Sequence, residues 1–103
     1  MDLAALRTIE NAEKFRFELK ENDKLIAFID YKIGRSGNWY LIHTEVLDQE
    51  RRGIGHKIVR ESLAIMEERN LKLVPSCPFV RAFIKKNRAE YEHLLADGVK
   101  LDD

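Results

Sequence analysis

Hydrophobic and polar residues alternate in the first half of the chain with the two-residue period of strands that face a core on one side. In the first alternating run, residues 15–20, one set of side chains is expected in the core and the other in water. The core set is Phe15, Phe17 and Leu19, and the water-facing set is Arg16, Glu18 and Lys20. Residues 25–33 alternate again and are apolar on both faces at their start. Two neighbouring strands are therefore expected, with Leu6–Ile9 as a candidate edge strand before them.

A third strand is predicted at Trp39–Leu47, where aromatic and β-branched residues are frequent. The segment before it, Gly34–Asn38, contains two glycines. Glycines at this place are typical of a hairpin loop. The first half of the chain is therefore expected to form antiparallel strands.

The apolar period lengthens to that of a helix beyond Gly53. The side chains expected on the buried face of this helix, about four turns long, are Ile54, Ile58, Val59, Ser62, Leu63 and Met66. A short apolar strand follows at Leu71–Val74, before two prolines. Two more helical stretches are expected at Phe79–Lys86 and Arg88–Ala96, the second ending at Gly98.

The order of these elements predicts a mixed α/β fold. A strand, a helix and a second strand at residues 39–74 form a β-α-β crossover, which places its two strands parallel. The antiparallel strands precede this unit and the helices follow it. With 103 residues and 12.1 kDa, the chain has the size of a single domain over residues 1–103, which excludes a two-domain enzyme.

Composition narrows the function further. Eighteen basic residues balance eighteen acidic ones, so a net-basic nucleic-acid binder is disfavoured. Cys77 is the only cysteine, so neither an intramolecular disulfide nor a cysteine-based zinc site is expected. The sequence lacks a run of 18 apolar residues and a signal pattern at its start. We therefore expect no metal and no membrane partner, and a reducing compartment such as the cytoplasm.

The segment Glu50–Lys57 combines two glycines with the start of the predicted helix. The first N–H groups of a helix lack internal partners and, together with the helix dipole, favour a bound anion such as a pyrophosphate. Cationic side chains surround this point: Arg51, Arg52, His56 and Lys57. The alternative is a tight strand-to-helix turn with solvated basic residues. The dinucleotide-binding pattern G-x-G-x-x-G is not met, because Ile58 stands where the third glycine should be. The Walker pattern is not met either, because no Gly-Lys-Ser/Thr follows.

Arg51-Arg52-Gly53-Ile54-Gly55 resembles the acetyl-coenzyme A pyrophosphate loop of GNAT-type N-acetyltransferases, written Q/R-x-x-G-x-G/A, with Glu50 as a departure at the first position. The segments HTEV at 43–46 and SCPFV at 76–80 narrow the resemblance to the small, single-domain YjdJ-type branch of that superfamily. The resemblance covers residues 15–95. It implies a GNAT-like mixed sheet that binds acetyl-coenzyme A as co-substrate and needs no metal.

The resemblance also implies where the co-substrate binds. Its pantetheine arm would lie between two splayed strands and pair with backbone near Glu45, and its pyrophosphate would meet the start of the helix. The residues expected to bind it are Val46, Leu47, Arg51, Arg52, Gly53, Ile54, Gly55, His56 and Lys57.

The resemblance implies catalysis in which an amine attacks the thioester directly in a ternary complex, and three residues of this sequence are candidates for it. His43 and Glu45 stand two apart on one strand and share a face about 7 Å apart, so either is a candidate base, with a backbone N–H near Val46 or Leu47 as oxyanion donor. The alternatives are a hydrogen-bonded histidine under the sheet and a solvated or ion-paired carboxylate. Cys77 precedes a helix, where a thiolate forms more readily.

Cys77 would then carry an acyl group, assist the coenzyme thiol or form a mixed disulfide with coenzyme A. The alternative is a small buried apolar side chain. Tyr91 is a weaker candidate for the general acid that protonates the departing thiolate, and the alternative is a side chain that only packs in its helix. Two functions therefore remain: an N-acetyltransferase for an amine, for example one on a protein or peptide, and an acyl-coenzyme A-binding module or sensor without turnover. A monomer or weak dimer fits both.

Overall fold

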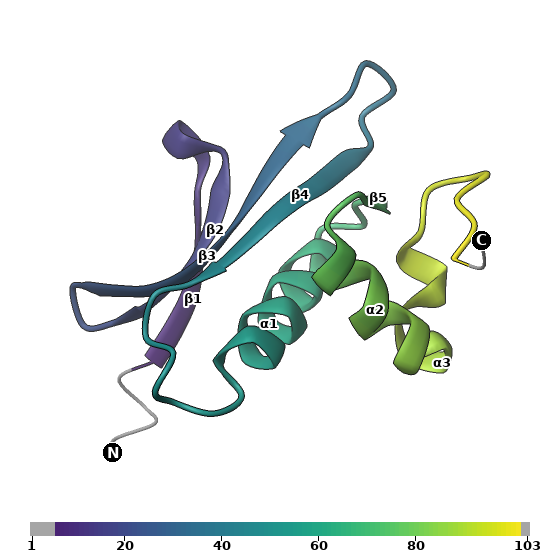
Figure 1. Cartoon of the computed structure of the whole chain (residues 1–103). Helices are drawn as coiled ribbons and strands as arrows, with labels where there is room; N and C mark the ends of the chain where they lie inside the picture. The colour runs from purple at the N-terminus through teal and green to yellow at the C-terminus, as the bar shows by residue number, and fades with distance from the viewer. Residues whose placement is uncertain (1–5, 102–103) are drawn as a thin grey trace.

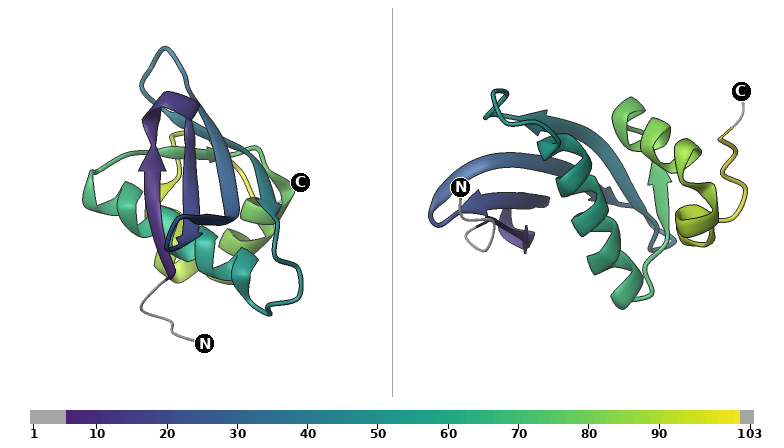
Figure 2. Two further views of the ribbon diagram at one scale, coloured as in Figure 1. Left: turned by 90° about the vertical axis from the view of Figure 1, so that its left-hand side faces the viewer. Right: turned by 90° about the horizontal axis from the view of Figure 1, so that it is seen from below.

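The computed structural model describes residues 6–101. One sheet holds five strands in the order β1-β2-β3-β4-β5, and α1 packs against β1–β4 while α2 and α3 lie around β5 (Figures 1 and 2). The strands are β1 (Leu6–Asn11), β2 (Arg16–Glu21), β3 (Lys24–Ile33), β4 (Trp39–Val46) and β5 (Leu73–Pro75). The helices are α1 (Ile54–Glu68), α2 (Pro78–Lys86) and α3 (Arg88–Tyr91), with 3-10 turns η2 (Ala12–Lys14) and η3 (Glu92–Leu94).

The strand pairing confirms the predicted mixed fold. β1 to β4 pair antiparallel with their neighbours, and β4 pairs parallel with β5. The crossover helix α1 runs between these two strands, as expected for a β-α-β unit. β1 is the edge strand that the sequence suggested at Leu6–Ile9.

The core lies between α1 and the sheet. All six predicted positions of α1 are buried: Ile54, Ile58, Val59, Ser62, Leu63 and Met66. They join fully buried sheet side chains such as Phe17, Leu19, Ile29 and Leu41 in one cluster. Apolar burial at this period is therefore what fixes α1 on the sheet.

Two predictions for the first strand were wrong. Phe15 does not belong to β2: it has a left-handed backbone (φ 55, ψ 55) and its side chain is 55% exposed. Glu18, expected in water, is only 2% exposed. One side chain from its own strand and one from β1 bind its carboxylate: Arg16 Nε lies 2.6 Å and Asn11 Nδ2 3.2 Å away.

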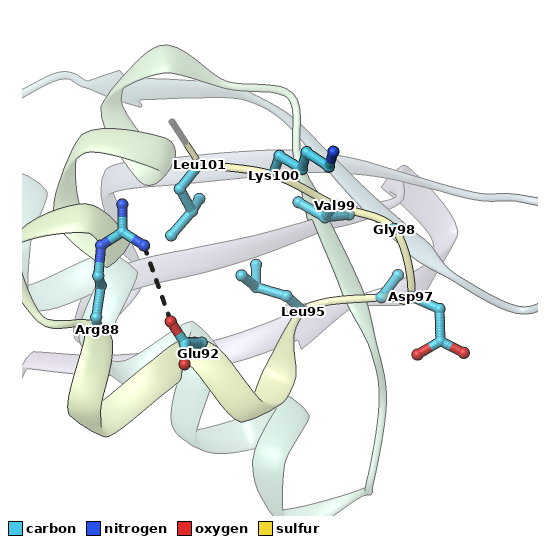
Figure 3. A pocket seen from close by; sticks show the side chains of 9 residues that line it. Arg88, Glu92, Leu95, Asp97, Gly98, Val99, Lys100 and Leu101 are labelled. Carbon is cyan, nitrogen blue, oxygen red and sulfur yellow. Dashed lines mark ion pairs between the residues drawn. The ribbon is translucent and has the colours of Figure 1, made fainter. Parts of the chain in front are cut away.

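The last predicted helix is shorter than expected, whereas α2 contains the whole of the predicted Phe79–Lys86. Arg88–Ala96 forms only α3 and η3, and the following segment folds back beside them (Figure 3). A hollow of about 470 Å³ lies there, with an Arg88–Glu92 ion pair of 3.8 Å on its wall, and contains none of the predicted site residues. Tyr91 is buried against Phe83, with ring centroids 5.4 Å apart, which matches its packing interpretation. None of the described helices is long and apolar enough to cross a membrane.

Candidate functional site

β4 and β5 diverge in the middle of β4. β5 pairs only with residues 39–41, and the last link is the Cys77 N–H, which donates to the Leu41 carbonyl at 2.7 Å. The register of β3 and β4 shifts at the same level, so that Ile42 is an extra residue, a β-bulge. Within residues 6–101, no strand pairs with Ile42–Val46 on the β5 side.

The free edge of β4 offers backbone groups to a ligand. The Leu47 N–H donates to the Ile26 carbonyl of β3 at 2.8 Å. Because successive residues of a strand point their backbone groups to opposite sides, those of Val46 and Thr44 point away from β3. Of the two backbone donors considered near the end of this strand, Leu47 is thus already paired and Val46 faces the gap.

Cys77 lies on the wall of this gap. It is 4% exposed and caps α2, whose first residue is Pro78. Its Sγ lies 3.4 Å from Thr44 Oγ1. Its burial agrees with the alternative of a small buried apolar side chain. Its position, where β4 and β5 part, is the one that a role near the acyl group or the coenzyme thiol requires. The structure thus pairs Cys77 with Thr44, a partner that sequence reasoning missed because nothing in the local pattern links residues 33 positions apart.

His43 and Glu45 form a hydrogen-bonded pair on the other face of β4. His43 Nε2 lies 2.9 Å from Glu45 Oε1, and the two side chains are 56% and 42% exposed. They share a face, as predicted, and the histidine lies in solvent beside Phe28 rather than under the sheet. Adjacent strand residues point to opposite faces, so β4 separates this pair from Thr44 and Cys77.

The start of α1 has the geometry of an anion site. Gly53 caps the helix with φ 79, a left-handed conformation that favours glycine. No side chain caps α1, and the first helical bond runs from the Lys57 N–H to the Gly53 carbonyl at 2.9 Å. The N–H groups of Ile54, Gly55 and His56 therefore lack helical partners and are available to an anion.

Gly55 has a packing role that the motif did not predict. A Cβ on this residue would lie 2.8 Å from Cζ of Phe79, so the glycine leaves room for the end of that ring. The His56 ring lies tilted beside the Phe79 and Phe83 rings, with centroids 5.6 and 5.9 Å away. These three rings and Lys86 line a hollow of about 280 Å³ next to the start of α1.

The basic residues of the loop divide into two groups. Arg51 is held by the carboxylates of Glu21 at 2.6 Å and Asp48 at 2.9 Å. The hydrogen bond to Glu21 raises the pKa of Arg51, and the charge of the same carboxylate adds to the effect. Lys57 pairs with Glu61 at 2.7 Å. Arg51 thus anchors the loop to the β2–β3 turn, and Arg52 is the loop arginine that has no ion pair with any residue of 6–101.

The described residues contain no group of three or more His, Cys, Asp or Glu side chains placed to hold a metal ion.

No curated protein matches the sequence significantly. The fold is similar to the solution NMR structure of a GCN5-like protein from Staphylococcus aureus, with a TM-score of 0.67 and 22% identity over 90% of each chain. The model of the family described as GCN5-related N-acetyl-transferase matches residues 15–94. The narrower YjdJ-type assignment stays a prediction. The chain belongs to the GCN5-related N-acetyltransferase family, whose members are acyl-transfer proteins.

Proposed function

We propose that the protein transfers an acetyl group from acetyl-coenzyme A to an amine by direct attack in a ternary complex. One observation carries the proposal: the unpaired stretch of β4 is followed, after the loop of residues 47–53, by the uncapped start of α1. A ligand with an amide-bearing arm and a pyrophosphate satisfies both sets of free backbone groups at once. A single anion, or a single extended strand, would satisfy only one of them.

The co-substrate would lie along β4. The carbonyl groups of Thr44 and Val46 would accept hydrogen bonds from its amide N–H groups, and the N–H groups at residues 54–56 would hold its pyrophosphate with help from Arg52. The hollow beside His56 is the natural seat for its adenosine end, with Lys86 near a phosphate. The acetyl thioester would then lie near Thr44 and Cys77, where β4 and β5 part.

The chain supplies groups for each proton transfer. His43, oriented by Glu45 at 2.9 Å, would take the proton from the ammonium of the acceptor, directly or through water. The amine nitrogen then forms a bond to the acyl carbon and the carbon–sulfur bond breaks. Cys77, beside Thr44 Oγ1, would donate a proton to the departing thiolate and regain one from the nitrogen, which loses its second proton as the amide forms. The Val46 N–H, free on the gap side, would stabilise negative charge on the acyl oxygen.

A second candidate function is a coenzyme A-binding module without turnover. The separation of the His43–Glu45 pair from Cys77 by the thickness of β4 favours it, because the base and the acid then act from opposite faces. Both functions share the coenzyme site, so they differ in turnover and not in binding.

Binding is the first test. Isothermal titration with acetyl-coenzyme A should show binding that weakens at least tenfold in Arg52→Glu, because the substitution places a negative charge beside the pyrophosphate. Arg35→Glu makes the same charge change in the hairpin loop before β4 and should bind like the wild type. Absence of heat with millimolar ligand would exclude both functions.

Turnover separates the two functions. Mass spectrometry of a mixed set of lysine peptides incubated with acetyl-coenzyme A should show adducts of 42 Da if the protein is a transferase. Tight binding without any adduct would leave only the binding module.

A further inference from the structure

A group of exposed apolar side chains gathers at the hairpin end of β3 and β4. Of the seven large apolar side chains exposed among residues 6–101, four lie here: Phe15 at 55%, Ile33 at 49%, Tyr40 at 37% and Ile42 at 37%. Phe15, Ile33 and Ile42 line a hollow of about 500 Å³, which we call the hairpin hollow. An apolar concentration of this kind on a small protein marks a surface that meets a partner.

Phe15 is held in an unfavourable conformation at this hollow. Its backbone is left-handed, which is rare for a bulky side chain and is found where the surroundings enforce it for function. Its carbonyl accepts a hydrogen bond from the Tyr31 N–H at 2.9 Å, and its ring meets the Tyr31 ring edge-on at 6.1 Å. The core gains little from this arrangement, since the ring stays more than half exposed.

The hairpin hollow adjoins the candidate base. Ile42 directly precedes His43, and Asp30, another residue of the lining, is the register partner of His43 on β3. The start of α1 lies at the opposite end of β4 (Figure 1). A co-substrate whose pyrophosphate binds there presents its acyl end toward the hairpin, so an acceptor arrives from the side of the hollow.

The charges around the hollow describe the acceptor. Asp30 lines the hollow and is the register partner of His43, so an ammonium group at this end of the hollow would find a carboxylate. Lys14 and Lys32 also line the hollow, and neither forms an ion pair with any residue of 6–101. The surface thus suits a ligand with an amine, a large apolar group beside it and an outlying carboxylate.

We infer that the hairpin hollow seats the acceptor, a polypeptide segment in which the amine-bearing residue stands next to a large apolar residue and near an acidic one. The inference rests on the proposed function. The inference adds to the proposed function the class of the acceptor and the surface that selects this acceptor. A polypeptide joins all three chemical groups within a few residues, and the open face of the sheet leaves room for its flanks.

Two blocked pentapeptides test the inference by NMR titration of the isotope-labelled protein in the presence of coenzyme A. The first is Asp-Leu-Lys-Leu-Asp, and the matched peptide replaces both leucines with serine. The leucine peptide should shift the amide signals of Phe15, residues 30–33 and Ile42, and should bind at least fivefold more tightly than the serine peptide.

Phe15→Gly provides the decisive variant, because glycine favours the left-handed backbone and the fold should be kept. It should weaken binding of the leucine peptide about tenfold, with no loss of thermal stability and no change in acetyl-coenzyme A affinity. Ile9→Ser, which removes an exposed apolar side chain from β1, should leave peptide binding unchanged.

The possible failures are distinct. If acetyl-coenzyme A shifts signals at residues 44–57 and the leucine peptide shifts none at the hollow, the acceptor inference is overturned and the proposed function stands. If acetyl-coenzyme A shifts none, the proposed function is overturned. If the hollow signals respond to protein dilution and not to peptide, a second copy of the chain covers the hollow, and the inference is overturned.

Discussion

The two halves of β4 belong to one strand but have opposite characters. Trp39 and Leu41 in the first half are buried and lie between β3 and β5. His43 and Glu45 in the second half are exposed, and the backbone there pairs on one side only. The change occurs at Ile42, where β4 gains a residue and β5 has ended. A strand can thus serve as core at one end and as a ligand edge at the other.

The largest expected effect is a difference between the two halves of β4 in how much a substitution lowers the free energy of unfolding. Leu41→Ala should lower the free energy of unfolding by about 3 kcal/mol, because a fully buried leucine leaves a cavity. Ile42→Ala, one residue further and 37% exposed, should cost less than about 1 kcal/mol. Urea denaturation measures both. Equal losses would mean that the bulge does not divide the strand.

A second prediction concerns catalysis at the exposed half. His43→Ala should lower kcat by about 100-fold, the usual contribution of a general base, and leave acetyl-coenzyme A affinity unchanged. His93 offers a matched control, because it forms a similar exposed pair with Glu67 at 2.6 Å on another part of the surface. His93→Ala should keep full kcat. A kcat for His43→Ala equal to that of the wild type would remove the histidine from the mechanism.

A third prediction concerns the helix that follows the exposed half. Gly55→Ala should destabilise by about 1 kcal/mol, since overpacking against Phe79 exceeds the gain in helix propensity. In a Phe79→Ala background the sign should reverse, and the same substitution should stabilise. Denaturation of the four proteins in this cycle provides the measurement. Additive effects would show that the contact with Phe79 does not explain the glycine.

The smallest effect concerns pH. Burial raises the pKa of Glu18, but hydrogen bonds from Arg16 and Asn11 and the charges of Arg16 and Lys20 lower it more, so the net pKa lies below its usual value. A lowered folded-state pKa contributes stability above the unfolded-state value of about 4.3 that is lost as the pH falls through the folded-state pKa.

Glu18→Gln should therefore flatten the acid side of the stability curve below about pH 5, with a change smaller than about 1 kcal/mol. Glu13→Gln, on the exposed turn η2, should leave the slope as it is. Thermal melts between pH 3 and 7 measure both variants. A steeper slope in Glu18→Gln would contradict the predicted sign.

Local periodicity was sufficient to predict the elements that bury one face. The spacing of apolar residues predicted every buried position of α1, and the order of strands and helices predicted the mixed sheet. The glycines and the start of a helix predicted the backbone geometry at Gly53. These features depend on neighbours in sequence, and a single sequence contains that information.

Features that depend on distant partners were not accessible in the same way. The bulge at Ile42 reverses which residues of β4 face the core, so Thr44, and not His43, meets Cys77. The burial of Glu18 depends on side chains from β1 and β2, and the role of Gly55 depends on Phe79, 24 residues away. A pattern of two or 3.6 residues carries no signal for such contacts.

The free edge of β4 also has a consequence for how the protein behaves at high concentration. Unpaired strand edges recruit strands from other molecules and promote aggregation, and this edge carries no proline and no lysine at residues 42–46. A ligand that pairs with Thr44 and Val46 would cover it. Saturation with coenzyme A at 100 times its Kd should add about 2.7 kcal/mol of stability and extend the shelf life of concentrated solutions.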